Sequence, residues 1–281
     1  MSFKKIKSYA KINIALNVIG KNSSLHKIET IVAFTSLHDD ILIKKIKSKK
    51  HTISFHGRFS KNIDKKNTIS KLLEVLEKKK LLSEKKFQIK INKKIPNRAG
   101  LGGGSMNAAS ILKYFVENKI IKTNQREIEL ISKSIGSDVI FGLNFTNSIL
   151  TAKNELKRFK GYNKFYTLIV KPNFGCSTKY IFSKVKNYDK PQFNKPTRKM
   201  FNFSFLKRAN NSLESIALLE YPKLKLIKLY LESISKTAFV RMTGSGSALV
   251  AYYQSKASCH KAEKMFKKKY KNYWCIASKT I

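Results

Sequence analysis

A cluster of glycines in the first half of the chain has the composition of a phosphate-binding loop. Residues 96–109 read P-N-R-A-G-L-G-G-G-S-M-N-A-A, and four of the five residues from Gly100 to Gly104 are glycine. Glycine has no side chain to keep a ligand away from backbone N–H groups. A strand-like run, Lys86–Ile91, precedes the loop, and a helix-like run, Asn107–Phe115, follows it. Such a helix adds N–H donors and the positive end of its dipole. The segment therefore predicts a cradle for the phosphates of a nucleotide.

Three well-known nucleotide motifs do not fit this cluster. No lysine follows the glycines where a P-loop requires one. The dinucleotide fingerprint normally opens a first βαβ unit, whereas this loop lies about a hundred residues into the chain. The H-R-D and D-F-G motifs that accompany the glycine loop of protein kinases do not occur in the sequence. A tight strand-to-helix turn without a ligand remains the alternative for the loop taken by itself.

Four motifs in order along the chain resemble the GHMP kinase superfamily, named for its galactokinase, homoserine, mevalonate and phosphomevalonate members. They are S-Y-A-K-I-N-I-A-L at 8–16, the glycine loop, I-G-S-D-V-I-F at 135–141 and R-M-T-G-S-G-S at 241–247. Weaker agreement at 26–41, 171–182 and 211–214 extends the resemblance over nearly the whole chain. It is greatest to the branch that phosphorylates the 2-hydroxyl of 4-diphosphocytidyl-2-C-methyl-D-erythritol in the non-mevalonate isoprenoid pathway.

The resemblance implies an α+β fold of two domains. Residues 1–155 would form an N-terminal GHMP kinase domain like ribosomal protein S5 domain 2, with the glycine loop and the catalytic residues. Residues 156–281 would form a C-terminal α/β-sandwich domain. The resemblance also implies ATP and Mg²⁺ as cofactors, and a small-molecule substrate that is a methylerythritol linked to cytidine diphosphate.

Two charged residues lie in the matched motifs and have the chemistry that phosphoryl transfer requires, namely a base for the acceptor hydroxyl and a cation beside it. By the resemblance, Asp138 is the base and Lys11 is its partner, which steadies the acceptor oxygen. From the residues alone, Asp138 is equally suited to cap the helix that follows it. Lys11 is equally suited to the surface face of a strand. Period two places Lys11 and Asn13 on the same face of that strand.

The resemblance also assigns the residues that bind the two substrates. His26 would bond to cytosine and Phe182 would stack on it, whereas His26 taken by itself could equally be a loop histidine without a ligand. The second glycine turn, Thr243–Ser247, would close over substrate and phosphates; a plain turn between strands is the alternative there. Mg²⁺ would be held through the ATP phosphates, with Ser105 or Asn107 as a further contact. The cofactor-binding residues are Pro96, Asn97, Arg98, Ala99, Gly100, Leu101, Gly102, Gly103, Gly104, Ser105 and Met106, and the substrate-binding residues are Asn13, His26, Phe182, Thr243, Gly244, Ser245 and Gly246.

Three positions depart from the pattern of the family. Arg98 stands where the family usually has a small residue, so its side chain must point outward or reach the phosphates as an extra cation. Met106 replaces a common serine, and a thioether cannot replace a hydroxyl hydrogen bond. Leu25 replaces the tyrosine that stacks on cytosine, so part of a stacking free energy of about 1–3 kcal/mol would be lost. Tyr180 and Tyr9 are candidates to compensate for it.

The elements that must position these residues follow from periodicity. Alternating or β-branched runs predict strands at 8–19, 30–34, 41–45, 52–55, 86–91, 148–151, 165–171, 238–242, 249–253 and 273–277. Helical spacing of apolar residues predicts helices at 67–80, 105–118, 125–135, 222–235 and 256–268. Lys186–Lys199 is polar, contains two prolines and is predicted to be a loop. Strands and helices mix without strict βαβ alternation, which favours an α+β fold.

The net charge of +41, from 58 basic and 17 acidic residues, is the one unusual property of the composition. It allows a nucleic-acid partner, but the lysine tracts are scattered and no nucleic-acid motif accompanies them. A lysine-biased composition is therefore the preferred interpretation. The absence of a long apolar run and the three scattered cysteines favour a cytoplasmic protein without a membrane partner, disulfides or zinc. The sequence leaves its oligomeric state open, as a monomer or weak dimer. A GHMP kinase acting on homoserine, mevalonate or a sugar, or an inactive basic nucleic-acid-binding relative, remains the alternative.

Overall fold

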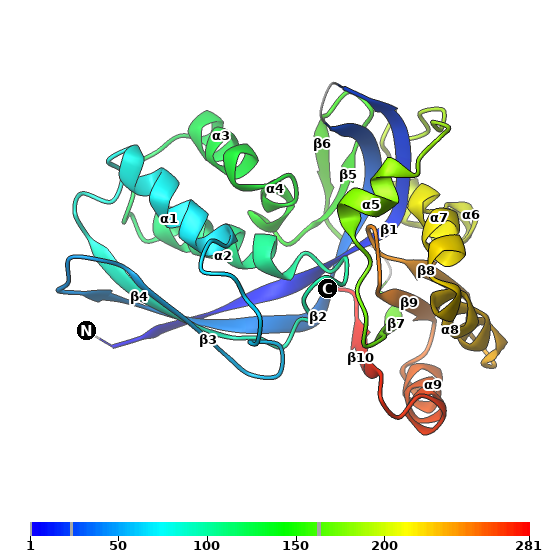
Figure 1. Cartoon of the computed structure of the whole chain (residues 1–281). Helices are drawn as coiled ribbons and strands as arrows, with labels where there is room; N and C mark the ends of the chain where they lie inside the picture. Colours follow the sequence, from blue (N-terminus) through cyan, green and yellow to red (C-terminus); the bar gives the residue numbers. More distant parts are fainter. Residues whose placement is uncertain (1, 23–24, 162–163) are drawn as a thin grey trace. The chain divides into compact units, whose positions relative to one another are not determined.

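The computed structural model describes residues 2–22, 25–161 and 164–281 and contains two compact units (Figure 1). Two long strands, β1 (Lys4–Lys21) and β2 (His26–Ile46), have residues in both units. Strands and helices mix along the chain, which confirms the α+β class. The domain boundary expected near residue 155 stays a prediction. Unit 1 comprises Met1–Lys11, Leu37–Asn97 and Gly102–Phe145, and unit 2 comprises Ile12–Ser36, Arg98–Leu101 and Thr146–Ile281.

The sheet of unit 1 is built around β4 (Lys86–Asn92), which lies between β2 and β3 (Thr52–His56). β4 pairs antiparallel with β2, from Asp40 opposite Asn92 to Ile46 opposite Lys86, and parallel with β3. Its alternating sequence K-F-Q-I-K-I-N buries every second side chain, because successive residues of a strand face opposite sides of a sheet. The buried face of the sheet therefore meets the helices of the unit.

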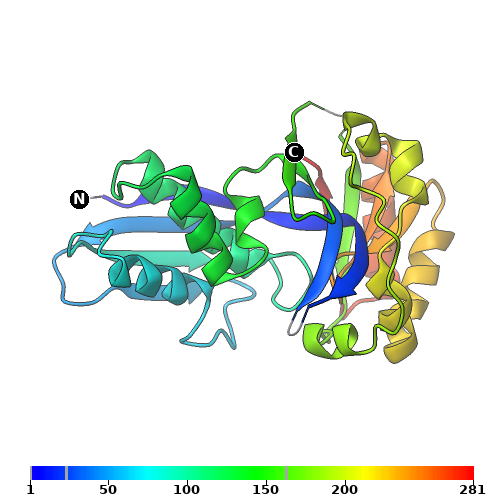
Figure 2. The same cartoon turned by 90° about the horizontal axis from the view of Figure 1, so that it is seen from above.

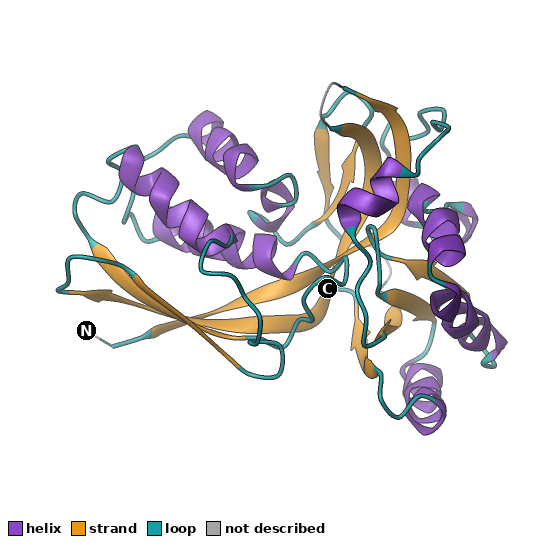
Figure 3. Cartoon of the chain, in the orientation of Figure 1, coloured by secondary structure: helices purple, strands orange, loops and turns teal. Residues whose placement is uncertain are grey.

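Four helices cover one face of this sheet: α1 (Thr68–Lys78), α2 (Gly103–Glu117), α3 (Gln125–Ile135) and α4 (Val139–Gly142) (Figure 3). α1 and α3 begin at Asn67 and Asn124, whose side chains accept hydrogen bonds from backbone N–H groups of the first turn. α2 buries most of its residues and shares one apolar core with α1, α3 and the sheet. The glycine loop thus leads into the central helix of the unit.

Unit 2 contains β5 (Asn147–Leu150) and β6 (Leu156–Phe159), which extend β2, and a second antiparallel sheet in the order β10–β7–β9–β8. Its strands are β7 (Tyr166–Lys171), β8 (Phe239–Met242), β9 (Leu249–Tyr253) and β10 (Trp274–Lys279). Its helices are α5 (Thr178–Ser183), a 3₁₀ turn (Arg198–Phe201), α6 (Phe203–Arg208), α7 (Ser212–Glu220), α8 (Pro222–Ser233) and α9 (Lys256–Lys269). Figure 2 shows α7 and α8, in yellow and gold, along one face of the orange strands, and α7, α8 and α9 share the core of this sheet.

The structure differs from the predicted elements in a few places. The two strands predicted at 30–34 and 41–45 are parts of one strand, β2, because the polar residues between them are paired rather than exposed. Asp39 and Asp40, for example, form ion pairs with lysines. The short elements β6, α5, α6 and α7 were not predicted, since each is too brief to show a clear period. None of the described helices is long and apolar enough to cross a membrane.

The segment predicted as a loop, Lys186–Lys199, is a loop except for its last two residues, which begin the 3₁₀ turn Arg198–Phe201. A buried carboxylate holds the loop in place. Glu29 of β2 is fully buried and accepts hydrogen bonds from the backbone N–H groups of Gln192, at 2.7 Å, and Phe193, at 3.0 Å. The Asn17 side chain donates to the same carboxylate at 2.8 Å. Donors from three positions thus offset the cost of burying the charge.

Candidate active site

The glycine loop delivers the chain into α2 without a capping side chain. Gly102 holds the N-cap position in the left-handed conformation (φ +65°), and no side-chain hydrogen bond caps the helix. α1 and α3, in contrast, are capped by Asn67 and Asn124. The first backbone N–H groups of α2 therefore remain to be satisfied by solvent or by an anion. Gly102, Gly103 and Gly104 add no side chains of their own beside these donors.

The two predicted catalytic residues form an ion pair beside this helix start. Lys11 Nζ lies 3.0 Å from Asp138 Oδ2; the lysine side chain is 4% exposed and the aspartate side chain 33%. A Cβ atom on Gly102 would lie 3.2 Å from Lys11 Cε and 3.3 Å from Lys11 Cβ. The stem of Lys11 thus packs against the loop, and the structure brings Lys11, Asp138 and Gly102 together within unit 1.

The side chains of Asp138 and Lys11 do not take the roles of a helix cap and a surface lysine, which were the alternatives from sequence. Asp138 does hold the N-cap position of α4, but its carboxylate makes no capping hydrogen bond. Lys11 is buried rather than on the surface of its strand. A buried ammonium next to a partly exposed carboxylate gives a site with one accessible acceptor for a proton and one fixed positive charge.

Oxygen atoms near the start of α2 are suited to a hard cation such as Mg²⁺. Ser105 Oγ lies 4.0 Å from the position of a Cβ on Gly136, two residues before Asp138. Asn107 is buried, and its Oδ1 has no hydrogen-bond partner among the described residues. Over the described ranges, no three His, Cys, Asp or Glu side chains gather as a metal site. The Ser105 hydroxyl and the Asn107 amide oxygen are thus the oxygen atoms near this helix start that could contact a cation.

The departures at Arg98 and Met106 have structural explanations. Arg98 has a left-handed backbone (φ +51°) and an exposed side chain. Met106 is fully buried and packs against Gly142 of α4, where a Cβ would lie 2.9 Å from its sulfur. Its backbone N–H donates to Gly102 O at 2.8 Å. Met106 therefore supports the loop from the core and presents no side chain to a ligand.

The other predicted loop side chains also serve the fold. Pro96, Ala99 and Leu101 are buried, and Asn97 donates to the backbone carbonyl of Phe59 at 2.9 Å. Gly100 has φ +71°, and a Cβ there would lie only 2.0 Å from Thr243 O. Any ligand contact of this stretch would therefore have to use the backbone or the small glycines.

The second glycine turn packs directly on Gly100 within unit 2. Thr243 Oγ1 donates to Gly100 O at 3.0 Å and accepts the Asn13 backbone N–H at 2.9 Å. A Cβ on Gly244 would lie 3.4 Å from Gly100 Cα and 3.5 Å from Asn13 Oδ1. The structure thus brings Asn13, Gly100, Thr243 and Gly244 together, and their role as parts of one site stays a prediction.

Further polar side chains brace this turn. Ser245 Oγ lies 2.8 Å from Thr178 Oγ1 at the start of α5. Asn211, which caps α7, donates through Nδ2 to Met242 O and Gly244 O, both at 2.8 Å. Glu214 of α7 accepts the Met242 N–H. The turn is therefore fixed from both sides. Gly246, the last predicted contact, also has a left-handed backbone (φ +84°).

The predicted base-binding residues His26 and Phe182 lie side by side, with ring centroids 5.0 Å apart. Tyr188 lies on the same histidine, 6.5 Å between centroids, and is exposed. Leu25 is 74% exposed and so does not fill this cluster. Burial, together with the charge of Lys21, holds the pKa of His26 below its ordinary value of 6.5. The imidazole is therefore neutral at about pH 7 and can both donate and accept a hydrogen bond.

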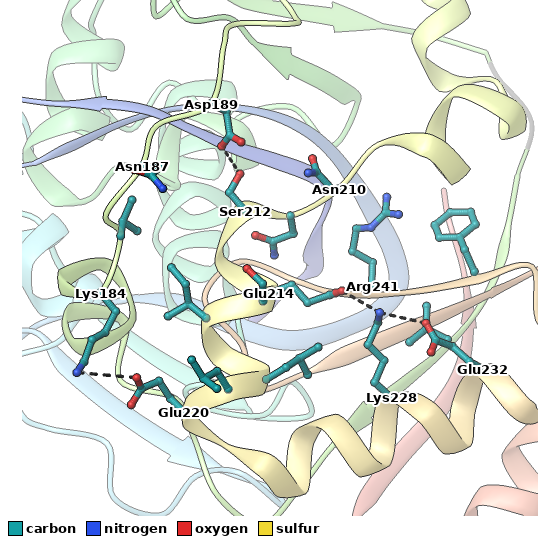
Figure 4. A pocket seen from close by; sticks show the side chains of 18 of the residues that line it. Lys184, Asn187, Asp189, Asn210, Ser212, Glu214, Glu220, Lys228, Glu232 and Arg241 are labelled. Carbon is teal, nitrogen blue, oxygen red and sulfur yellow. Dashed lines mark hydrogen bonds and ion pairs between the residues drawn. The ribbon is translucent and has the colours of Figure 1, made fainter.

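A groove of about 1100 Å³ runs along α7, and none of the predicted site residues lines it (Figure 4). Its carboxylates are engaged by neighbours: Asp189 with Ser212, Glu220 with Lys184, and Glu214 with Lys228. Arg241, at its edge, is buried and donates to the carbonyls of Ile14 and Leu206 at 3.0 and 2.9 Å. Three of the side chains that border the groove, Asn211, Glu214 and Arg241, thus already form hydrogen bonds to the backbone in or near the second glycine turn.

Solved structures of several small-molecule kinases share this fold. Residues 67–145 match the family model "GHMP kinases N terminal domain". The structure resembles a crystal structure of 4-(cytidine 5'-diphospho)-2C-methyl-D-erythritol kinase with a TM-score of 0.79, at 20% identity over 99% of both chains. A homoserine kinase from Cytophaga hutchinsonii gives a TM-score of 0.71, at 15% identity over 99% of this chain and 94% of that one. At these identities the structures establish the fold, which is that of the GHMP kinases.

Sequence similarity narrows the class to one family. The chain is 56% identical over 277 residues to the 4-diphosphocytidyl-2-C-methyl-D-erythritol kinase of Pelagibacter ubique (strain HTCC1062), covering 99% of both proteins. It is 31% identical to the enzyme of that name from Petrotoga mobilis, covering 87% of this chain and 96% of the relative. The chain belongs to the 4-diphosphocytidyl-2-C-methyl-D-erythritol kinase family. It is accordingly an ATP-dependent phosphotransferase of the GHMP kinase superfamily.

Sequence reasoning missed several residues that the structure places at these sites. Asn211 precedes an apolar helical run, which is the signal of a helix cap, but nothing in the sequence shows that it also holds the glycine turn. Thr178 and Tyr188 lie in segments without periodicity. Asp39 was one of two adjacent acids in a strand, and its link to the glycine loop, described below, depends on tertiary contacts alone.

We predict that Gly102→Ala lowers turnover because the new methyl group displaces Lys11. Alanine in a left-handed conformation costs about 1–2 kcal/mol, and its Cβ would also press on the lysine stem at 3.2 Å. Gly161→Ala is the matched control, since Gly161 has φ +63° and belongs to unit 2. Urea unfolding should show similar losses of stability for both, while kcat falls by about tenfold or more in Gly102→Ala alone. Equal kcat values in the two variants would contradict the packing of Lys11 on the loop.

Proposed function

We propose that this enzyme transfers the γ-phosphoryl group of ATP to the 2-hydroxyl of 4-diphosphocytidyl-2-C-methyl-D-erythritol, in the non-mevalonate pathway of isoprenoid precursor synthesis. The observation that carries the proposal is the Lys11–Asp138 pair beside an uncapped helix start. The names of relatives that match over nearly the full chain support the choice of substrate.

Within this proposal, each residue of the pair has a separate task. Asp138, with its partly exposed carboxylate, takes the proton of the acceptor hydroxyl as the new P–O bond forms. Lys11 keeps the carboxylate oriented through its ion pair and stabilises the negative charge that develops on the acceptor oxygen. The N–H groups at the start of α2 bind phosphate oxygens, where the helix dipole favours negative charge.

Mg²⁺ is the cation proposed for this site, and when bound it would neutralise charge on the phosphate oxygens. Ser105 Oγ and Asn107 Oδ1 are the protein oxygens proposed to hold it, directly or through water. Oxygen donors of this kind suit Mg²⁺, which usually keeps several waters and binds mainly to the phosphates of its nucleotide.

The cytosine ring is proposed to bind at the His26, Phe182 and Tyr188 cluster. The neutral imidazole of His26 offers a donor and an acceptor to the edge of the base, and Phe182 offers a face for stacking. Tyr188 replaces the stacking face that Leu25 does not supply. Tyr180 and Tyr9 are occupied elsewhere: Tyr180 donates to Glu220, and Tyr9 packs on Phe145 at 5.1 Å.

The proposed partner of the chain is its small-molecule substrate alone, in the cytoplasm. The net charge of +41 would attract anionic substrates such as ATP whatever its origin. The proposal includes no nucleic acid or membrane, and an oligomer no larger than a weak dimer.

The experiment that tests the substrate assignment is an ATP-consumption assay with four acceptors: the cytidine diphosphate compound, its uridine analogue, homoserine and mevalonate. We expect turnover with the first and a much weaker response to the second, because His26 would meet a different base edge. Turnover with homoserine or mevalonate instead would replace the substrate but keep the class. No ATP consumption with any acceptor, together with salt-sensitive binding of unrelated DNA, would favour the nucleic-acid-binding alternative.

We predict that Asp138→Asn and Lys11→Met each lower kcat by about two orders of magnitude or more, the scale of losing a general base or a fixed charge at a transition state. Asp64→Asn makes the same chemical change at an exposed position and serves as the control. Circular dichroism should show that all three variants fold. Normal turnover in Asp138→Asn would remove Asp138 from the mechanism.

We predict that the KM for the cytidine substrate is constant at about pH 7 and above and rises in acid, because protonation of His26 removes its acceptor. Since burial lowers the pKa of His26, the rise should begin only below the ordinary value of 6.5. His26→Gln keeps a donor and an acceptor but does not titrate, so its KM should lose this acid dependence. The same acid rise in His26→Gln would assign the titration to another group.

A further inference from the structure

One buried carboxylate joins the two ends of the glycine loop. Asp39 of β2 is fully buried, and its Oδ1 accepts the backbone N–H groups of Lys94, at 2.7 Å, and Ile95, at 2.8 Å, just before the loop. Its Oδ2 accepts Asn107 Nδ2, from the second turn of α2, at 3.0 Å, and also the Lys93 ammonium. All of these residues belong to unit 1.

The four donors use the full hydrogen-bonding capacity of the carboxylate, which has about four lone-pair sites. Two donors come from the strand side of the loop, one from the helix side, and one from a buried lysine. Lys93 is itself 2% exposed, so the pair is an ion pair inside the protein. A buried ion pair is no more stabilising than well-packed apolar side chains of the same volume. Stability alone therefore does not explain why these two charges are buried.

The network lies directly under the first turn of α2. A Cβ on Gly103 would be 3.0 Å from Ile95 Cγ2 and 3.2 Å from Lys93 Nζ. Gly103 thus packs on the side chains of Ile95 and Lys93. Asp39 accepts hydrogen bonds from the backbone of Ile95 and from the ammonium group of Lys93. Because Asp39 accepts from Asn107 Nδ2, it also fixes which way the Asn107 amide faces and leaves Oδ1 without a partner among the described residues.

We propose that Asp39 is a positioning residue for the nucleotide: through Asn107, Lys93 and the backbone of Lys94 and Ile95 it fixes the start of α2, and so sets the affinity for ATP. This rests on the proposed function of the glycine loop as the ATP site. Asp39 touches neither substrate and acts through the groups that it holds. Its effect should fall on ATP and spare the acceptor.

The test is a double-mutant cycle of Asp39→Asn and Asn107→Ala, with Asp40→Asn as the matched control. In Asp39→Asn one oxygen can still accept from Lys94 and Ile95, but the new amide meets two donors, Lys93 and Asn107. Asp40→Asn removes a carboxylate one residue away that pairs with Lys94 and Lys5 instead. Steady-state KM values for ATP and for the cytidine substrate, and the midpoint of thermal unfolding, are measured for each variant.

We expect Asp39→Asn to raise the KM for ATP about tenfold or more, the loss of a charge-assisted hydrogen bond, with little change in the KM for the acceptor. Asp40→Asn should leave both values near wild type. The double variant should be no worse than the stronger single variant, because coupled residues do not add. Additive effects, a parallel rise of both KM values, or an ATP KM equal to that of Asp40→Asn would overturn the proposal.

Two further measurements test the proposal if Asp39→Asn does not fold or if the wild-type enzyme does not use the cytidine substrate. Should Asp39→Asn not fold, Asn107→Ala alone, which leaves the ion pair intact, must raise the KM for ATP, and an unchanged value overturns the proposal. Should the wild-type enzyme not turn over the cytidine substrate, the proposed function fails separately. Calorimetric titration of each variant with a non-hydrolysable ATP analogue then measures the role of Asp39 directly.

Discussion

The burial of one ammonium group organises unit 1 around the start of α2. Removing a lysine charge from water costs several kcal/mol unless an anion lies beside it, and the Lys11 side chain is almost wholly buried. Asp138 must therefore stand within ion-pair distance, which fixes α4 against β1 and the start of α2. That approach requires glycine at two places. Gly102 leaves room for the lysine stem, and a Cβ on Gly142 would lie 2.7 Å from the Cβ of Ala109 in α2.

Around this pair, the backbone is available for binding while the side chains support it. The loop side chains that depart from the family pattern point into the core or into solvent, as Met106 and Arg98 do. The groups proposed to bind phosphates are N–H donors of α2, which do not depend on side-chain identity. In the second glycine turn, too, side chains support the backbone. Asn211 donates to its carbonyl groups, and Thr243 forms a hydrogen bond to Gly100. This explains how substitutions at family positions leave the architecture of the loop intact.

The sequence predicted the order of the long elements, the α+β class and the glycine loop at a strand-to-helix junction, because these leave local signals. Resemblance predicted the pairing of Lys11 and Asp138, which no local pattern could, since the two residues are far apart in the chain. Asp138 does hold an N-cap position, as the capping alternative predicts, and only its side-chain direction separates capping from ion pairing. Asp39, Tyr188 and the bracing role of Asn211 were beyond prediction because each depends on contacts across the fold.

The excess of basic over acidic residues is related to the need of buried backbone N–H groups for an acceptor. Exposed positions accept a lysine at little cost to stability, whereas a carboxylate that accepts backbone N–H groups cannot be replaced by lysine, which has no acceptor. Glu29 accepts the N–H groups of Gln192 and Phe193, Asp39 those of Lys94 and Ile95, and Glu214 that of Met242. In a chain with 17 acids against 58 bases, the carboxylates at these sites have a task that no basic side chain could take over. A bias toward lysine is therefore limited where the backbone needs an acceptor, and these three carboxylates hold their segments in place within a chain of net charge +41.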